Sequence, residues 1–159
     1  MKIVTVSTAA DKARIIEEVL ADLPEWFGLP ESTKEYIKDG SALPLWAAYD
    51  ADEAVGFVTL TNSSEACGDV HCMGIKKAYH RQGIGRLLMQ ALEEEARKDY
   101  AYLQVKTVDE GHYKEYDQTI AFYKSCGFVK LEVFPTLWDE WNPCLLMIKK
   151  IIDNGEHRL

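Results

Sequence analysis

The segment from residue 79 to residue 86 has the residue types of an anion-binding loop. It reads Tyr79-His80-Arg81-Gln82-Gly83-Ile84-Gly85-Arg86. Two glycines one residue apart, Gly83 and Gly85, let backbone N–H groups approach a ligand with no Cβ in the way. The helical pattern that follows adds the N–H groups and the positive dipole end of its first turn. This combination is suited to binding a phosphate group.

The charge near this loop is opposite in sign to that of the whole chain. Between residues 76 and 86 the chain has Lys76, Lys77, Arg81 and Arg86 and no acidic residue, whereas the 159 residues together have a net charge of −8. A basic segment centred on a glycine loop indicates an anionic cofactor. The acidic balance of the chain argues against nucleic acid as a partner, because nucleic acid requires a broad basic face.

Three kinds of phosphate-binding loop can be compared with this segment. A Walker A loop requires the pattern G-x-x-x-x-G-K-[ST], and the sequence has no such string. A dinucleotide-binding loop requires a third glycine at the position of Leu88. An acyl-CoA pyrophosphate loop needs only backbone amides and no metal. We favour the third kind and keep a nucleotide-binding α/β protein as an alternative.

Two segments of the chain resemble the GNAT superfamily of acyl-CoA N-acyltransferases. The loop pattern of that family, [RQ]-x-x-G-x-[GA], corresponds to His80–Gly85, with both glycines matched and a histidine in first position. The segment Thr119–Phe128 resembles the family pattern A-x-x-[FL]-Y-x-x-x-G-F, with threonine in place of alanine. Tyr116 stands where an asparagine is common. The resemblance is close over about residues 69–128.

The resemblance implies an enzyme that transfers an acetyl group from acetyl-CoA to a primary amine. The amine would belong to a small molecule or a peptide and would attack the thioester directly in a ternary complex. The loop would hold the pyrophosphate, and the strand before it would hold the thioester and the pantetheine arm. The implied cofactor-binding residues are Met73, Gly74, Ile75, His80, Arg81, Gln82, Gly83, Ile84, Gly85, Arg86, Tyr116, Thr119 and Tyr123.

Proton transfer in this reaction requires an acid and a base. Tyr123 matches the general acid of the family, which protonates the departing CoA sulfur. A tyrosine hydroxyl with an ordinary pKa of about 10 is protonated at neutral pH, as a proton donor must be. Candidates for the base are His71, Asp69 and Glu65, or a chain of water molecules. We choose His71 because imidazole titrates near neutral pH, although histidines in strands are often structural.

Aromatic residues in two loops are candidates for the wall of the acceptor site. Trp26 and Phe27 lie in a loop broken by proline and glycine, and Trp138 lies in a second loop. With acidic residues nearby they would suit an amine, and the alternative is that they cover the ends of the core. The four cysteines include no C-x-x-C pair, which indicates reduced thiols, and we expect no metal site.

The elements that must position these residues follow from hydrophobic periodicity and capping residues. Strands are expected at Lys2–Val6, Leu45–Tyr49, Val55–Thr61, Asp69–Ile75, Tyr100–Val108, Phe128–Phe134 and Cys144–Ile152. Helices are expected from the capping box at Thr8 to about Leu20, from a second capping box at Ser32 to Asp39, directly after the glycine loop, and at Gln118–Ser125. The strand–helix–strand unit around the loop implies locally parallel strands. The predicted fold is α/β: a GNAT-like mixed, mostly antiparallel sheet of about seven strands with helices on both faces.

Length and composition indicate one domain. We expect residues 1–153 to form a single GNAT-like N-acetyltransferase domain and residues 154–159 to be a frayed tail. No stretch approaches the ~20 apolar residues of a membrane helix, and the N-terminus is unlike a signal peptide, so we predict a cytoplasmic protein with no membrane partner. The resemblance leaves a homodimer open. The alternative function is a non-catalytic, acyl-CoA-binding regulatory module of the same fold.

Overall fold

The computed structural model describes residues 1–152, so the expected tail at residues 154–159 lies outside the described residues. The chain forms two compact units. The first unit comprises residues 1–61 and 70–96, and the second comprises residues 62–69 and the chain from residue 97 onward. Among the described residues, no helix is long and apolar enough to cross a membrane.

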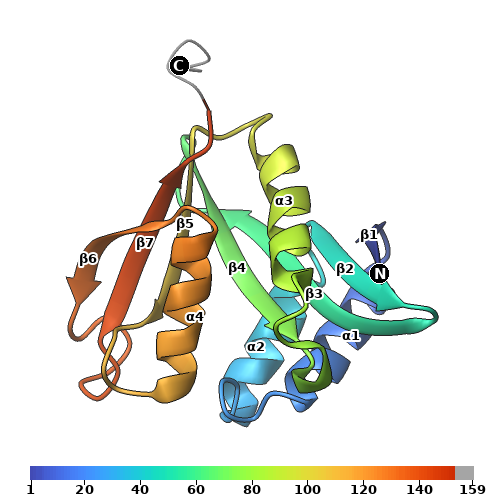
Figure 1. The fold of residues 1–159 in the computed structure, drawn as a ribbon, viewed down its shortest axis with the longest axis horizontal. Helices are drawn as coiled ribbons and strands as arrows, with labels where there is room; N and C mark the ends of the chain where they lie inside the picture. Colours follow the sequence, from blue (N-terminus) through green and yellow to red (C-terminus); the bar gives the residue numbers. More distant parts are fainter. Residues whose placement is uncertain (153–159) are drawn as a thin grey trace. The chain divides into compact units, whose positions relative to one another are not determined.

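Seven strands form one sheet in the order β1-β2-β3-β4-β5-β7-β6 (Figure 1). The strands are β1 (Lys2–Val6), β2 (Leu45–Asp50), β3 (Glu53–Asn62), β4 (Cys67–Ile75), β5 (Tyr102–Val108), β6 (Val129–Phe134) and β7 (Cys144–Lys150). The helices are α1 (Ala9–Ala21), α2 (Pro30–Gly40), α3 (Ile84–Ala96) and α4 (Lys114–Ser125), with a short 3-10 helix η1 (Lys77–Tyr79). The pairs β1–β2, β2–β3, β5–β7 and β6–β7 are antiparallel, and β4–β5 is parallel. The predicted mixed, mostly antiparallel sheet of the GNAT-like fold is confirmed.

In the first unit, helices pack on both faces of the strands. Phe57 of β3 is buried in a core cluster with Ile16 and Val19 of α1. The preceding residue, Gly56, faces the other way: a Cβ there would lie 3.4 Å from Leu88 of α3. Because successive residues of a strand point to opposite faces, α1 and α3 cover opposite sides of β3.

In the second unit, α4 packs against β5, which pairs with β7. β5 and β7 pair along their whole lengths, and β6 pairs with the outer side of β7. The core of this unit is formed by fully or almost fully buried apolar side chains of β5, β7 and α4 and of the residue before β6, namely Leu103, Val105, Ile120, Phe128, Leu145 and Met147. β4 joins this unit through Cys67–Asp69, which pair in parallel with β5. The strand–helix–strand unit predicted around the glycine loop is confirmed.

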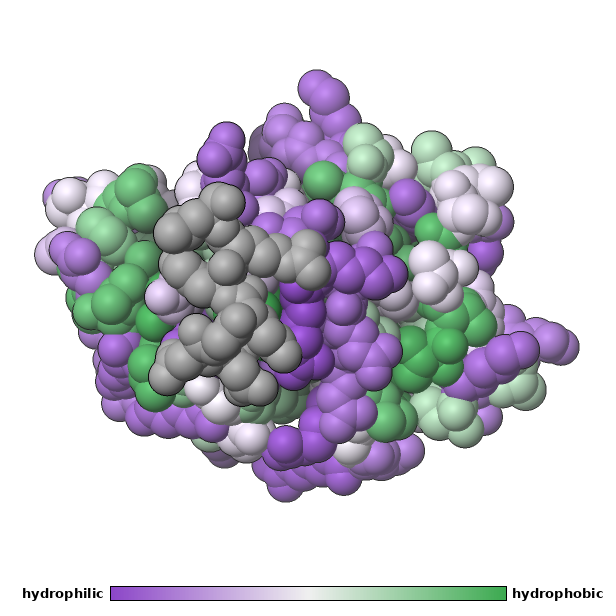
Figure 2. Space-filling model, turned by 90° about the horizontal axis from the view of Figure 1, so that it is seen from above, coloured by the Kyte–Doolittle hydropathy of each residue, from purple (hydrophilic) through white to green (hydrophobic). Residues whose placement is uncertain are grey.

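The surface mixes apolar and polar side chains. Figure 2 shows separate green areas among purple ones on one face of the molecule. Individual large apolar side chains are exposed in the second unit, including Leu131 and Trp141. Three of the exposed apolar side chains, Val129, Leu131 and Val133, lie on β6 at the edge of the sheet.

Of the two predicted capping boxes, the one at Thr8 is confirmed in its N-cap hydrogen bond. The Thr8 hydroxyl accepts a hydrogen bond from the N–H of Asp11 at 3.2 Å, and α1 begins at Ala9. The box predicted at Ser32 is wrong, because α2 begins two residues earlier, at Pro30, and Leu29 at its N-cap makes no side-chain hydrogen bond. Proline is favoured in the first helical turn because its φ is already helical and its missing N–H needs no partner.

The other differences are at element ends. α4 begins at Lys114, about one turn before the predicted start at Gln118. The added turn is polar and shows no apolar periodicity, but Glu115 and Asp117 in it favour the helix N-terminus electrostatically. β7 ends at Lys150 rather than at Ile152.

Candidate functional site

The glycine loop has a backbone that only a few residue types tolerate. Arg81 and Gly83 have φ values of 62° and 80°, both in the left-handed region. A Cβ added at Gly83 would meet no atom within 4 Å. The glycine is therefore required by its φ and not by close packing, and the space beside it is open. The carbonyl of Gly83 accepts the N–H of Leu87 at 3.2 Å, so the first turn of α3 starts directly after it.

His80 ties the loop to the end of β4. Its Nε2 lies 2.6 Å from the carbonyl oxygen of Ile75. A carbonyl can only accept, so Nε2 carries the proton. The indole of Trp26 lies edge-on to the same imidazole, with ring centroids 5.8 Å apart. The family pattern has arginine or glutamine at this position. Here a histidine stands there, and its hydrogen bond holds the start of the loop against the last residue of β4.

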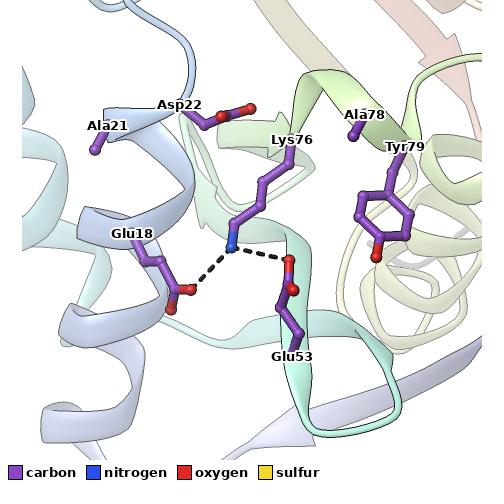
Figure 3. A pocket seen from close by; sticks show the side chains of 7 residues that line it. All are labelled: Glu18, Ala21, Asp22, Glu53, Lys76, Ala78 and Tyr79. Atoms are coloured by element: carbon purple, nitrogen blue, oxygen red, sulfur yellow. Dashed lines mark hydrogen bonds and ion pairs between the residues drawn. The ribbon is translucent and has the colours of Figure 1, made fainter.

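The two lysines before the loop are paired with carboxylates. Lys76 Nζ lies 2.8 Å from Glu18 and 3.2 Å from Glu53, as Figure 3 shows. Lys77 Nζ lies 2.8 Å from Glu25. Two of the four basic side chains that suggested an anionic cofactor are therefore neutralised within the first unit. The suggestion of an anionic cofactor then rests on the loop backbone.

Further contacts fix η1 in place. The backbone N–H of Lys77 donates to Asp22 Oδ2 at 2.7 Å, and the Tyr79 hydroxyl donates to Asp50 Oδ2 at 2.7 Å. Asp22 follows α1, and Asp50 is the last residue of β2. The segment that leads into the loop is thus anchored to a helix and to a hairpin.

The residues of β4 alternate between buried and half-buried. Gly74 is buried, and its neighbours Met73 and Ile75 are half-buried. A Cβ at Gly74 would lie 3.1 Å from side-chain carbons of both Val19 and Leu23 in α1. Close packing of α1 therefore requires a small residue at this position.

His71 lies in a network of hydrogen-bonding and aromatic side chains of the first unit. Its Nδ1 is 2.9 Å from the hydroxyl oxygen of Thr59, which also donates to the carbonyl of Cys72 at 3.3 Å. The ring of Tyr36 lies edge-on to the imidazole at 5.6 Å, and Phe27 lies edge-on to Tyr36 at 5.6 Å. The structure thus brings Phe27 to His71 through Tyr36, and Trp26 to His80.

Tyr36 and Thr59 are residues that the sequence analysis did not select. Tyr36 lies in α2. In the sequence, Tyr36 and Ile37 indicate only that this side of the helix is buried. Thr59 is fully buried in β3. A threonine inside an apolar strand is a weak signal of a buried hydrogen bond.

Asp69, the other carboxylate considered as a base, belongs to the second unit. Its Oδ2 accepts from Gln104 Nε2 at 3.3 Å and lies 3.5 Å from Lys106 Nζ. The carboxylate is therefore already engaged with β5.

The remaining predicted site residues lie in the second unit. The ring of Tyr123 packs edge-on against Phe128 at 5.8 Å, and its side chain is buried. The Thr119 hydroxyl donates to a carbonyl of its own helix at 3.1 Å. Burial raises the pKa of the Tyr116 hydroxyl. Trp138 is about half exposed, in the loop before β7.

No group of three or more histidine, cysteine, aspartate or glutamate residues within residues 1–152 could hold a metal ion. The described cysteines are free thiols. Cys72 is buried, and burial raises the pKa of its thiol. A thiol of this kind does not ionise at neutral pH, which removes the most buried cysteine of β4 as a nucleophile.

A family model described as an acetyltransferase (GNAT) domain matches residues 41–130, which is more than half of the chain. This chain belongs to the GNAT acetyltransferase family. The matched stretch includes β4, the glycine loop, α3 and α4. The resemblance seen in the sequence is confirmed.

Individual proteins that resemble this chain in sequence or structure are acetyltransferases by name, in agreement with the family model. Over 63 residues the chain is 36% identical to the N-alpha-acetyltransferase RimI of Mycobacterium tuberculosis, an alignment that covers 40% of this chain and 35% of that protein. An aminoglycoside 6'-N-acetyltransferase complexed with coenzyme A has a similar structure, with a TM-score of 0.76, 19% identity, and coverage of 97% and 99% of the two chains. A putative acetyltransferase, yncA of Salmonella typhimurium with its cofactor acetyl-CoA, gives a TM-score of 0.74, 16% identity, and coverage of 100% and 96%. At these identities the structural likeness establishes the fold, and the chain spans about a third of RimI.

Proposed function

We propose that this protein transfers an acetyl group from acetyl-CoA to a primary amine of a small molecule or a peptide. The observation that carries the proposal is the loop before α3, with left-handed backbone at Arg81 and Gly83 and open space beside Gly83. Backbone amides there can bind a diphosphate without a metal. The complexes of two similar structures with coenzyme A and acetyl-CoA support this choice of cofactor.

Each of the two units contains residues that we propose as cofactor contacts. In the first unit, the loop from His80 to Arg86 would bind the pyrophosphate, and Met73–Ile75 would bind the thioester. A backbone N–H of that strand would stabilise the negative charge that develops on the thioester oxygen. In the second unit, Tyr116, Thr119 and Tyr123 of α4 are the proposed contacts.

The proposed chemistry is a direct displacement. The neutral amine nitrogen attacks the thioester carbon, a C–N bond forms, and the C–S bond breaks. His71 would remove the proton that keeps the amine from attacking, and Tyr123 would protonate the departing CoA sulfur. Trp26, Phe27 and Trp138 are proposed to line the acceptor site. The name of RimI, an N-alpha-acetyltransferase, supports a peptide acceptor, and the aminoglycoside enzyme supports a small molecule.

Calorimetric titration with acetyl-CoA tests the cofactor, with ATP as the competing ligand. Gly83→Asp and Gly83→Ala both impose a side chain at a φ of 80°, but only aspartate adds a negative charge. We expect binding of about micromolar affinity in the wild type, weaker binding in Gly83→Ala and none in Gly83→Asp. Binding of ATP in preference to acetyl-CoA would instead support the nucleotide-binding alternative.

Turnover distinguishes the enzyme from a binding module of the same fold. Thiol release from acetyl-CoA is measured with a panel of polyamines, aminoglycosides, amino acids and dipeptides. Tyr123→Phe keeps the ring that packs on Phe128 and removes only the hydroxyl. We expect it to lower kcat by about 10²–10⁴-fold with unchanged acetyl-CoA binding, and the control Tyr102→Phe on β5 to keep full activity. Acetyl-CoA binding without turnover on any amine would support the regulatory module.

A further inference from the structure

The hydroxyl of Thr59 makes two hydrogen-bonding contacts, but it can donate in only one of them because it has a single hydrogen. Its Oγ1 lies 2.9 Å from His71 Nδ1 and 3.3 Å from the carbonyl oxygen of Cys72. The carbonyl can only accept, so the threonine hydroxyl must donate to it. The contact with Nδ1 is then a hydrogen bond only if Nδ1 is the donor.

The alternative arrangement satisfies fewer contacts. If the hydroxyl donated to Nδ1, the carbonyl oxygen of Cys72 would no longer accept a hydrogen bond from Thr59. Thr59 is fully buried, so no solvent replaces a lost hydrogen bond there. The arrangement that satisfies both contacts puts the imidazole proton on Nδ1.

We propose that Thr59 is a positioning residue that holds neutral His71 in its Nδ1–H tautomer. In that tautomer Nε2 carries the lone pair and is the ring nitrogen that can take a proton. The tautomer itself does not depend on the proposed function. Only the role of Nε2 in removing a proton from the amine rests on that function. The edge-on contact with Tyr36 restricts rotation of the ring, so the choice of tautomer also fixes the direction of the lone pair.

The other histidine of the site shows the opposite pattern. His80 donates from Nε2 to the carbonyl of Ile75. Its proton is therefore committed to holding the loop. The two imidazoles of the first unit carry their protons on different nitrogens, and the hydrogen-bond partner decides which.

The direct test is a long-range ¹H–¹⁵N correlation spectrum of the histidine rings at a pH where they are neutral. His71→Gln and His80→Gln spectra assign the signals. We expect the pattern of a protonated Nδ1 and an unprotonated Nε2 for His71, and the reverse for His80. A protonated Nε2 on neutral His71 in the wild type would overturn the proposal.

Variants of Thr59 test the cause. Thr59→Val keeps the shape and removes the hydroxyl, and Thr59→Ser keeps the hydroxyl. We expect the valine variant to shift His71 toward the Nε2–H tautomer, which free histidine favours, and the serine variant to retain the wild-type pattern. An unchanged tautomer in a folded Thr59→Val would contradict the role given to Thr59.

Kinetics test the consequence for the reaction. Because only one tautomer has a basic Nε2, we expect Thr59→Val to lower kcat about five-fold with an unchanged KM for acetyl-CoA, in proportion to the population lost. Thr59→Ser should restore kcat. If the valine variant changes the tautomer but leaves kcat unchanged, His71 is not the base, and the assignment of Nε2 to proton removal fails. If the wild type acetylates no amine, the proposed function fails, and the spectra still decide the tautomer.

Discussion

Gly74 and Gly83 are glycines for different physical reasons. A Cβ at Gly74 would be crowded at 3.1 Å by two side chains of α1, whereas a Cβ at Gly83 would meet nothing within 4 Å. At Gly83 the requirement lies in the backbone, where φ is 80°. A substitution at Gly74 should therefore change the stability of the first unit, and one at Gly83 should change the loop and what it binds.

Replacing Gly74 by alanine tests the packing argument. We expect Gly74→Ala to lower the free energy of unfolding by about 1–3 kcal/mol, because the added methyl group overpacks the contact with α1. Val19→Ala removes one of the crowding carbons. In denaturant titrations the double variant should be more stable than the sum of the two single changes predicts. Simple additivity would show that the two side chains do not compete for the same space.

Helices α1 and α2 start in different ways, although the sequence shows an apparent capping box at each. Thr8 accepts the N–H of Asp11, while Ser32 lies inside α2, two residues after Pro30. The first start depends on a side-chain hydrogen bond, and the second on the fixed φ of a proline.

Alanine substitutions separate the two cases. Thr8→Ala should lower the free energy of unfolding by about 1 kcal/mol, because an N-terminal N–H loses its acceptor. Ser32→Ala should be neutral or stabilising by a few tenths of a kcal/mol, because alanine is the better residue inside a helix. Both are measured by chemical unfolding. An equal loss in the two variants would mean that Ser32 does cap the helix.

The segment η1 depends on an ion-pair network. Burial lowers the pKa of Lys76, but its hydrogen bonds with Glu18 and Glu53 outweigh that effect and raise the pKa above its ordinary value. The ion pairs of Lys76 therefore contribute their full stabilisation at pH values below the pKa that this amine has in the unfolded chain, near 10.5. The stabilisation is lost as the pH rises through the higher pKa of the amine in the folded protein.

Lys76→Met tests this network against an exposed pair. We expect a loss of about 1–2 kcal/mol at neutral pH, between the values for exposed and buried ion pairs. The difference from the wild type should begin to shrink above about pH 10.5, where the amine of the unfolded chain loses its proton, and should disappear above the higher pKa of the folded protein. Lys34→Met, which breaks an exposed pair with Glu31, should change stability by less than about 0.5 kcal/mol. A deficit of Lys76→Met that persisted at high pH would point to lost packing instead.

Local patterns predicted most elements, and they could not predict contacts between distant residues. The apolar stripe of α3, the cap at Thr8 and the alternation along β4 are encoded over a few neighbouring residues. The pairing of Lys76 with Glu18 joins positions 58 residues apart. The basic segment therefore overstated the charge available to a ligand. Thr59 and Tyr36 contact His71 only because β3 and α2 come to β4 in the fold.

On the scale of the whole molecule, each of the two units contains some of the proposed cofactor residues. The loop and Met73–Ile75 belong to the first unit, and α4 with Tyr123 belongs to the second. If both sets of residues contact acetyl-CoA, the ligand should slow hydrogen exchange of backbone amides in both units.

The net charge of the chain is −8, so its overall field repels an anionic cofactor. Such a cofactor must therefore be bound by local groups.

Hydrogen exchange measured with and without acetyl-CoA tests this division. We expect slower exchange at residues 83–88 and at residues 116–123, and an increase in global stability of about 2.7 kcal/mol at a ligand concentration of 100 times Kd. Gly83→Asp should abolish both effects. Protection confined to residues 83–88 would remove Tyr116, Thr119 and Tyr123 from the cofactor site.

The three contacts that hold η1 and His80 have a consequence for the thermodynamics of binding. The bonds from Lys77 to Asp22, from Tyr79 to Asp50 and from His80 to Ile75 restrict the chain just before the loop in the absence of any ligand. The entropy of ordering this segment is lost when the protein folds and not when a ligand arrives. A ligand of the loop would therefore meet a rigid receptor, and its affinity would reflect contacts rather than the cost of immobilising the chain.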